Sequence, residues 1–187
     1  IYLHMFRGMM YGSYQKPREL LWVLGWITYV LLCALGFTGY VLPWGQMSFW
    51  AAQVILSLVG SIPFFGEELL TWIRGDYLIS GITLNRLFAF HVVLLPLALI
   101  AVVFVHILAL HEVGSNNPDG VDVKKFKDDD GVPLDTKPFF PYDVMHDLYA
   151  IGVFLIFFVT IMFFYPDGGG YVIEYVNYEA ADNLKTP

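Results

Sequence analysis

Two histidines lie fifteen residues apart inside one long apolar segment, and this pair limits what the chain can fold into. The segment from Ile82 to Leu110 is ITLNRLFAFHVVLLPLALIAVVFVHILAL, with the histidines at His91 and His106, and it is long enough to cross a bilayer as a helix. Fifteen helical residues separate the imidazoles by roughly 22 Å along the axis and by about 60° around it. That separation favours two cofactors stacked across the membrane over one metal ion. The alternative is a pair of neutral histidines hydrogen-bonded between helices.

The composition indicates a membrane protein. Of 187 residues, 57% are hydrophobic, 18% are aromatic and only 14% are charged, which is a low charge content for a soluble domain. The net charge of −7 comes from acids between the apolar runs. A single cysteine, Cys33, excludes both a disulfide framework and a thiolate metal site. Since no basic leader precedes Ile1, we expect an interior piece of a longer polypeptide.

Three apolar segments are predicted to cross the membrane, so the fold class is an all-α integral membrane bundle. The first runs from Glu19 to Leu42, the second from Ile82 to Leu110 and the third from Asp147 to Tyr165. Residues 1–10 read as the end of a fourth span. Two short apolar helices are expected within residues 47–73, in the connection between the first two spans; they are too short to span and are expected at the membrane surface.

Lysine and arginine predict the orientation of the spans. Seven of the ten basic residues fall before the first span or between the second and third, namely Arg7, Lys16, Arg18, Lys124, Lys125, Lys127 and Lys137. The positive-inside rule places this group in the cytoplasm. We therefore expect the second span to run inward, with His91 near the outer face and His106 near the inner face.

Two glycines in the first span nearly repeat the spacing of the histidines. Gly25 and Gly39 are fourteen residues apart, and glycine weakens the interior of a helix. Close approach of the edge of a flat macrocycle to the backbone would explain glycines at these two depths. Ordinary packing of small residues between membrane helices is the alternative.

A third histidine extends the pattern. His4 precedes Arg7 by one helical turn, at the depth expected for His106. A histidine can ligate a haem iron while an arginine one turn away pairs with a haem propionate, so we expect a haem bridging His4 and His106. The ligand opposite His91 would fall before the first residue, and Arg86 could reach the propionates of that outer haem. For each arginine taken alone, snorkelling at a helix end is the better interpretation.

Long ordered motifs carry a resemblance to a known family. They are RGMMYGSY (7–14), GYVLPWGQMSFW (39–50), TLNRLFAFH (83–91), LHEVGSNNP (110–118) and FFPYDVMHDL (139–148). With these motifs the chain resembles the cytochrome b subunit of the quinol:cytochrome c oxidoreductase, respiratory complex III, in a bacterial form lacking both ends. The resemblance implies that residues 1–187 are part of one haem-binding transmembrane domain.

The resemblance also implies the cofactors. His91 would ligate a low-potential b-type haem near the outer face, and His4 and His106 would ligate a high-potential b-type haem near the inner face. Gly25 and Gly39 match the glycines that give the two macrocycles room. The expected activity is that of a quinol--cytochrome-c reductase subunit, which moves electrons through both haems and couples them to proton translocation in a Q cycle.

Two quinone sites follow from the same resemblance. Quinol would be oxidised at an outer site within residues 40–52, which includes Tyr40 and Pro43. The positions that match the inner, quinone-reducing site are His111, Ser115 and Asp147, with His146 beside them. His146 stands where much of the family has lysine, and Ala51 stands where many relatives have glycine. A Pro-Glu-Trp-Tyr segment of the outer site would follow Pro187.

The implied partners are a Rieske iron–sulfur protein, a cytochrome c1-type subunit, membrane lipid and quinone, in a homodimeric complex of the bacterial inner membrane, with no nucleic acid. Two other classes are weighed against this interpretation. A di-haem quinone-reactive membrane anchor of another oxidoreductase would lack the motif GYVLPWGQMSFW. A haem-free transporter or structural subunit would require the three histidines and two glycines to align by accident.

Overall fold

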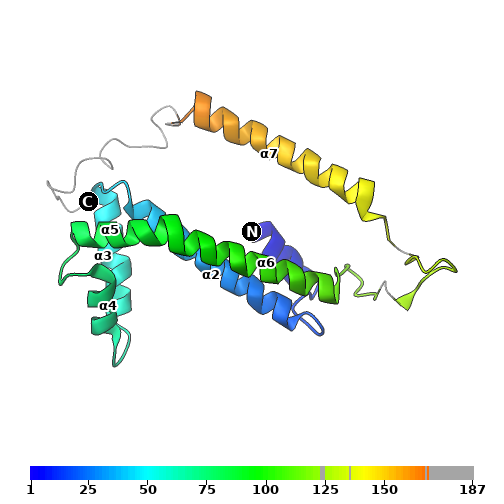
Figure 1. The fold of residues 1–187 in the computed structure, drawn as a ribbon, viewed down its shortest axis with the longest axis horizontal. Helices are drawn as coiled ribbons and strands as arrows, with labels where there is room; N and C mark the ends of the chain where they lie inside the picture. The colour runs from blue at the N-terminus through cyan, green and yellow to red at the C-terminus, as the bar shows by residue number, and fades with distance from the viewer. Residues whose placement is uncertain (123–124, 135, 167, 169–187) are drawn as a thin grey trace. The chain divides into compact units, whose positions relative to one another are not determined.

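The structure, a computed structural model, describes residues 1–122, 125–134, 136–166 and 168, so that Lys124 of the predicted cytoplasmic group lies outside the described residues. In chain order the helices are α1 (Tyr2–Met10), α2 (Glu19–Val41), α3 (Gln46–Gly60), α4 (Gly66–Arg74), α5 (Gly81–Ala89), η1 (Phe90–Leu94), α6 (Leu95–Val113), η3 (Phe139–Asp143) and α7 (Val144–Phe164), as drawn in Figure 1. Within the described ranges β-pairing is limited to an isolated bridge between Lys127 and Pro133. The predicted all-α fold is confirmed.

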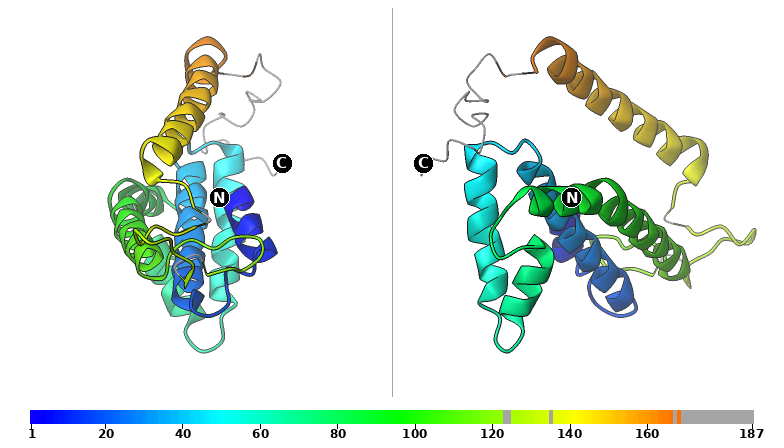
Figure 2. Two further views of the ribbon diagram at one scale, coloured as in Figure 1. Left: turned by 90° about the vertical axis from the view of Figure 1, so that its right-hand side faces the viewer. Right: turned by 60° about the vertical axis from the view of Figure 1, so that its left-hand side comes forward.

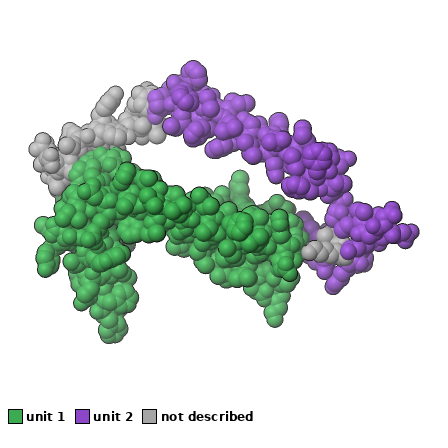
Figure 3. Space-filling model, viewed as in Figure 1, with its two compact units in different colours: residues 1–115, 175–187 green, residues 116–174 purple. Residues whose placement is uncertain are grey.

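The chain forms two compact units, coloured separately in Figure 3. The described part of the first unit is residues 1–115, which holds α1 to α6, and the second unit begins at residue 116 and holds η3 and α7. Each unit is described by itself below.

Three helical segments are long and apolar enough to cross a membrane, as the sequence predicts. They are Glu19–Val41, Gly81–Val113 and Phe139–Phe164. The third begins eight residues earlier than expected because η3 precedes α7. Phe140 in η3 has an extended backbone (φ −103°, ψ 133°), which is the conformation favoured before a proline, and continuous α-helix begins only at Val144.

The second span is one continuous helix with an irregular turn. It consists of α5, η1 and α6, and η1 is π-helical. Pro96 lies in the first turn of α6, directly after η1, and lacks the N–H that an α-helix would use there. The turn before Pro96 is π-helical and holds an extra residue compared with an α-helical turn.

Helix α2 packs along this second span, and Figures 1 and 2 show the two side by side. The hairpin of α3 and α4 packs at the outer end of the pair, and in Figure 1 its axes run across the direction of the two spans. Helices in that direction lie along a membrane surface when the spans cross it. The position of the hairpin at the membrane surface stays a prediction.

A small core holds the outer end together. It is formed by α2, α3, α4, the segment before α5 and α5 itself, and its buried apolar residues are Val41, Ala52, Leu56, Leu70, Ile79 and Leu87. Local capping fixes the connection: the Ser80 hydroxyl accepts from the Ile82 N–H, and the Thr83 hydroxyl accepts from the Ser80 N–H and donates to the Arg74 carbonyl oxygen. Thr83 thereby joins the start of α5 to the end of α4.

Candidate functional site

The inner level of the site is formed by three residues on three helices. His106 on α6 lies over Gly25 on α2, because a Cβ added to Gly25 would be 3.4 Å from His106 Cε1. His4 on α1 lies beside them, with its ring centroid 6.3 Å from that of His106 and the ring planes 75° apart. Two imidazoles that share one metal through nitrogen bonds of about 2 Å have ring centres about 6 Å apart. The spacing of His4 and His106 therefore fits an iron ion held between them.

The outer level pairs His91 of η1 with Gly39 of α2. A Cβ added to Gly39 would lie 2.6 Å from His91 Cε1 and 3.1 Å from His91 Nδ1, so only glycine fits without a shift of the ring. The sequence analysis predicts that both glycines make room for the edge of a macrocycle. The nearest group in the structure is instead the imidazole itself, and room for a macrocycle at either level stays a prediction.

Two hydrogen bonds fix the protonation of His91. Its Nδ1 lies 3.0 Å from the Leu35 carbonyl oxygen and 3.2 Å from Thr38 Oγ1. A carbonyl oxygen can only accept, so Nδ1 carries the proton and Nε2 keeps the lone pair that a metal needs. Metal-ligating histidines commonly make such a bond with their other nitrogen. His106 Nδ1 is buried and makes no hydrogen bond of ordinary geometry within the described part of the chain, although the backbone of Leu21 interacts with this histidine.

The described residues contain no group of three or more histidine, cysteine, aspartate or glutamate side chains that could hold a metal ion. The assignment of the three histidines as haem ligands stays a prediction. Thr38 is the residue that sequence reasoning missed here. The available signal was a polar residue at membrane depth beside Gly39, which is expensive unless it has a partner.

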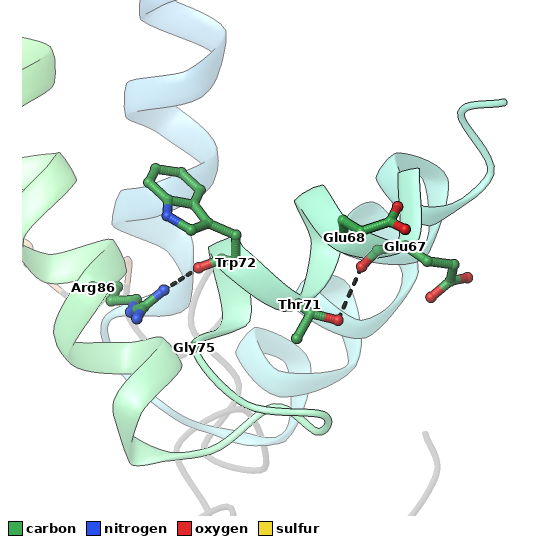
Figure 4. A pocket seen from close by; sticks show the side chains of 6 residues that line it. All are labelled: Glu67, Glu68, Thr71, Trp72, Gly75 and Arg86. Atoms are coloured by element: carbon green, nitrogen blue, oxygen red, sulfur yellow. Dashed lines mark hydrogen bonds between the residues drawn. The ribbon is translucent and has the colours of Figure 1, made fainter. Parts of the chain in front are cut away.

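The two arginines expected near propionates have different surroundings. Arg7 is exposed in the last turn of α1, and its guanidinium carbon lies 5.4 Å from the centroid of the Tyr11 ring. The Arg86 guanidinium donates to the carbonyl oxygen of Trp72 near the end of α4, as Figure 4 shows. Arg86 therefore secures α4 to α5 in this structure, and its role toward a propionate stays a prediction.

A surface hollow of about 500 Å³ lies between α4 and α5, and Figure 4 shows the six residues that line it. Its lining residues are Glu67, Glu68, Thr71, Trp72, Gly75 and Arg86. Gly75 takes the left-handed conformation that ends α4 (φ 75°), and a Cβ there would lie 2.6 Å from Arg86 Nε. The hollow is wide open and lies outside both histidine levels.

The residues expected at the outer quinone site lie where α2 turns into α3. Tyr40 is next to the last residue of α2 and is 49% exposed, and Pro43 is an exposed residue of the turn. The neighbouring Trp44 has a positive φ of 53°, a strained backbone conformation for a bulky residue. Ala51 lies on α3, so the segment 40–52 forms one continuous corner.

The residues expected at the inner quinone site fall in both units. In the first unit, His111 is exposed in the last turn of α6 and Ser115 follows the end of that helix. Arg18 donates from Nε to the Gly114 carbonyl oxygen at 3.0 Å and from Nη2 to the Ser115 carbonyl oxygen at 3.1 Å. Arg18 thus connects the start of α2 to this turn. The sequence analysis considered Arg18 only for the orientation of the spans and did not predict this contact.

In the second unit, His146 and Asp147 are exposed in the first turn of α7. The His146 Nδ1 lies 2.7 Å from the carbonyl oxygen of Tyr142, one turn earlier. Because a carbonyl oxygen can only accept, the His146 Nδ1 carries the proton in this bond.

Comparison with known proteins decides the family. A family model described as cytochrome b (N-terminal)/b6/petB matches residues 1–169. This chain belongs to the cytochrome b family. Cytochrome b of Allochromatium vinosum is 52% identical over all of this chain and 46% of its own length. Cytochrome b/c1 of Bradyrhizobium diazoefficiens is 46% identical over all of this chain and 26% of its own length.

A solved structure described as hyperthermophilic respiratory Complex III is similar over 100% of this chain and 48% of its own chain, with a TM-score of 0.82 and 35% identity. The chain spans about half the length of this structure and of the cytochrome b relative from Allochromatium vinosum. Family membership makes the chain part of a cytochrome b, and its three helical segments that are long and apolar enough to cross a membrane agree with a multi-pass membrane protein. A haem-free transporter and a membrane anchor of another class are thereby set aside.

Proposed function

We propose that this chain is the part of a di-haem cytochrome b that carries electrons between an outer quinol-oxidation site and an inner quinone-reduction site. The observation that supports it best is the pair of histidine–glycine contacts at two depths of α2, His106 with Gly25 and His91 with Gly39. One haem b at each level, when bound, supplies an iron that accepts and releases one electron. Two such centres form a path across the membrane.

At the inner level, His4 and His106 would hold the haem iron, and the 6.3 Å between their ring centroids supports this assignment. Arg7, one turn after His4, would neutralise a propionate by a charge-assisted hydrogen bond. At the outer level, His91 would present Nε2 to the iron, with Nδ1 held by the Leu35 carbonyl. The second ligand there would lie outside residues 1–187.

The quinone chemistry would take place at the two ends of this path. Tyr40 and Pro43 would bound the outer site at the corner between α2 and α3. At the inner site, His111, Ser115 and Asp147, with His146, would bind the quinone and exchange the two protons that its reduction takes up, because a histidine and a carboxylate can both transfer protons near neutral pH.

The rest of the proposal concerns the assembly. Oxidation of quinol at the outer site requires an acceptor for the electron that does not enter the haem path, and a Rieske iron–sulfur protein with a cytochrome c1-type subunit would provide it. We infer a homodimeric complex surrounded by lipid in the bacterial inner membrane. The b/c1 name of the Bradyrhizobium relative supports a cytochrome c1 partner.

The test is haem content and a redox-poised visible spectrum of the purified full-length complex. We expect two b-type haems per full-length chain that are reduced in two separate steps, with His106→Ala removing the step at higher potential. His146→Ala, in the first turn of α7, is the matched control and should keep both steps. A single haem would contradict the assignment of two levels, and a complex without haem would overturn the proposal.

A further inference from the structure

Two residues of α2 recur with an offset of fourteen at the two histidine levels, and the residue before each glycine does not. Gly25 corresponds to Gly39, and Leu21 corresponds to Leu35. The residue before each glycine differs, because Leu24 precedes Gly25 whereas Thr38 precedes Gly39. At the outer level, the Thr38 hydroxyl lies beside His91. At the inner level, the matching residue is Leu24, which has no hydroxyl.

The Thr38 hydroxyl lies between the helix backbone and His91. Its Oγ1 is 2.9 Å from the Ala34 carbonyl oxygen, 3.1 Å from the Leu35 carbonyl oxygen and 3.2 Å from His91 Nδ1, and the residue is only 5% exposed. The single hydroxyl proton goes to a backbone carbonyl, a common bond for threonine inside a helix. Its oxygen lone pair then accepts from the protonated Nδ1 of His91, which makes it a second acceptor beside Leu35.

Thr28 on the same helix makes the same backbone hydrogen bond as Thr38, but no hydrogen bond to a histidine is seen for it among the described residues. Its hydroxyl donates to the Leu24 carbonyl oxygen at 3.0 Å, the same bond to the residue four positions earlier. At the other level, the backbone of Leu21, the counterpart of Leu35, interacts with His106, and among the described residues no side-chain hydroxyl is bonded to its buried Nδ1. The two histidines thus differ in their hydrogen bonds although each lies against a glycine of α2.

We propose that Thr38 lowers the reduction potential of the outer haem by accepting a hydrogen bond from His91. The inference rests on the proposed function, since it needs a haem on His91. An acceptor on the N–H of an imidazole ligand makes the ligand a stronger electron donor, which stabilises the oxidised metal. His91 has the Thr38 hydroxyl as an acceptor in addition to a backbone carbonyl, whereas a leucine stands at the matching position before Gly25. The arrangement thus gives a physical reason for a lower potential of the outer haem. Thr38 acts through His91 and is a positioning residue.

The experiment is a potentiometric titration of the full-length complex carrying Thr38→Val, Thr38→Ser or Thr28→Val. Valine has nearly the shape of threonine and leaves the Leu35 carbonyl bond to His91 in place, so the ring keeps one acceptor. We expect Thr38→Val to change the ratio of oxidised to reduced outer haem at a fixed potential by about threefold toward the reduced form, which is about +30 mV at 59 mV per tenfold for one electron. Thr38→Ser, which keeps the hydroxyl, should restore the original potential.

Two internal controls separate this effect from general damage. Thr28→Val removes a comparable hydroxyl and should move neither haem, and the inner haem of the Thr38→Val complex should titrate as before. The electron paramagnetic resonance signal of the oxidised outer haem, which responds to the donor strength and orientation of its imidazoles, should change only in Thr38→Val.

The outcomes distinguish the inference from the proposed function. Two haems with an unchanged outer potential in Thr38→Val, or an equal shift in Thr28→Val, overturn the role of Thr38 and leave the haem assignment standing. A wild-type complex without an outer haem overturns both.

Discussion

Alanine at Gly39 is the substitution for which the structure gives the clearest expectation. The added Cβ would lie 2.6 Å from His91 Cε1, and ordinary contact begins near 3.4 Å, so the imidazole must move by about 0.8 Å. His91 cannot move freely because its Nδ1 is bonded to Leu35 at 3.0 Å. Overpacking of this kind destabilises a protein by about 1–3 kcal/mol. We expect Gly39→Ala to lower the free energy of unfolding by that amount and to displace the ligand of the outer haem.

Two other glycines of α2 provide a graded comparison. A Cβ at Gly25 would meet His106 Cε1 at 3.4 Å, and a Cβ at Gly36 would meet nothing within 4 Å. Alanine is favoured over glycine inside a helix by about 0.5–1 kcal/mol, so Gly36→Ala should stabilise the protein and Gly25→Ala should be nearly neutral for the apoprotein.

The assay combines thermal unfolding of the purified full-length protein with its haem spectrum. The expected order of damage is Gly39→Ala, then Gly25→Ala, with Gly36→Ala least harmful. If Gly36→Ala is as damaging as Gly39→Ala, the contact argument is wrong. If Gly25→Ala and Gly39→Ala each lose one haem equally, contact with the macrocycle, as the sequence predicts, governs both glycines.

Two further predictions concern the arginines. Replacing Arg18 by Gln removes a charged donor from the Gly114–Ser115 turn, so the KM for quinone reduction at the inner site should rise by about threefold or more with haem content unchanged. Lys16→Gln is the control, and equal kinetics in both variants would contradict the role of the Arg18 hydrogen bonds. Replacing Arg86 by Gln removes the bond to the Trp72 carbonyl, which should destabilise the α4–α5 junction by about 1–3 kcal/mol and speed proteolysis there. A changed outer-haem spectrum with an intact junction would instead support the propionate role.

The helices were predictable because their signals are local. The bounds of α2 and of the second span agree with the prediction within three residues, since a long apolar run between polar ends and prolines can satisfy its backbone in a membrane only as a helix. The start of the third span was less predictable. Phe139 and Phe140 are apolar but precede Pro141, and the extended backbone at Phe140 separates them from α7.

The candidate site was predictable in part. Spacing along each helix identified His91, His106, Gly25 and Gly39 as candidates, and the structure pairs each histidine with one glycine. The surroundings of Arg86 were not predictable, because a long side chain reaches whichever acceptor the neighbouring helix presents, and here that is the end of α4.

By itself the sequence determined the class of the protein, the helices and the two depths of the site, because hydrophobic length and residue spacing act within one helix. It left a mismatch, since the histidines are fifteen residues apart and the glycines fourteen. The π-helical turn η1 reconciles them by holding one extra residue. Only the packing of α2 against the second span brings each histidine to its glycine and Thr38 into contact with His91. Contacts between helices depend on their rotation and register, which no single segment specifies.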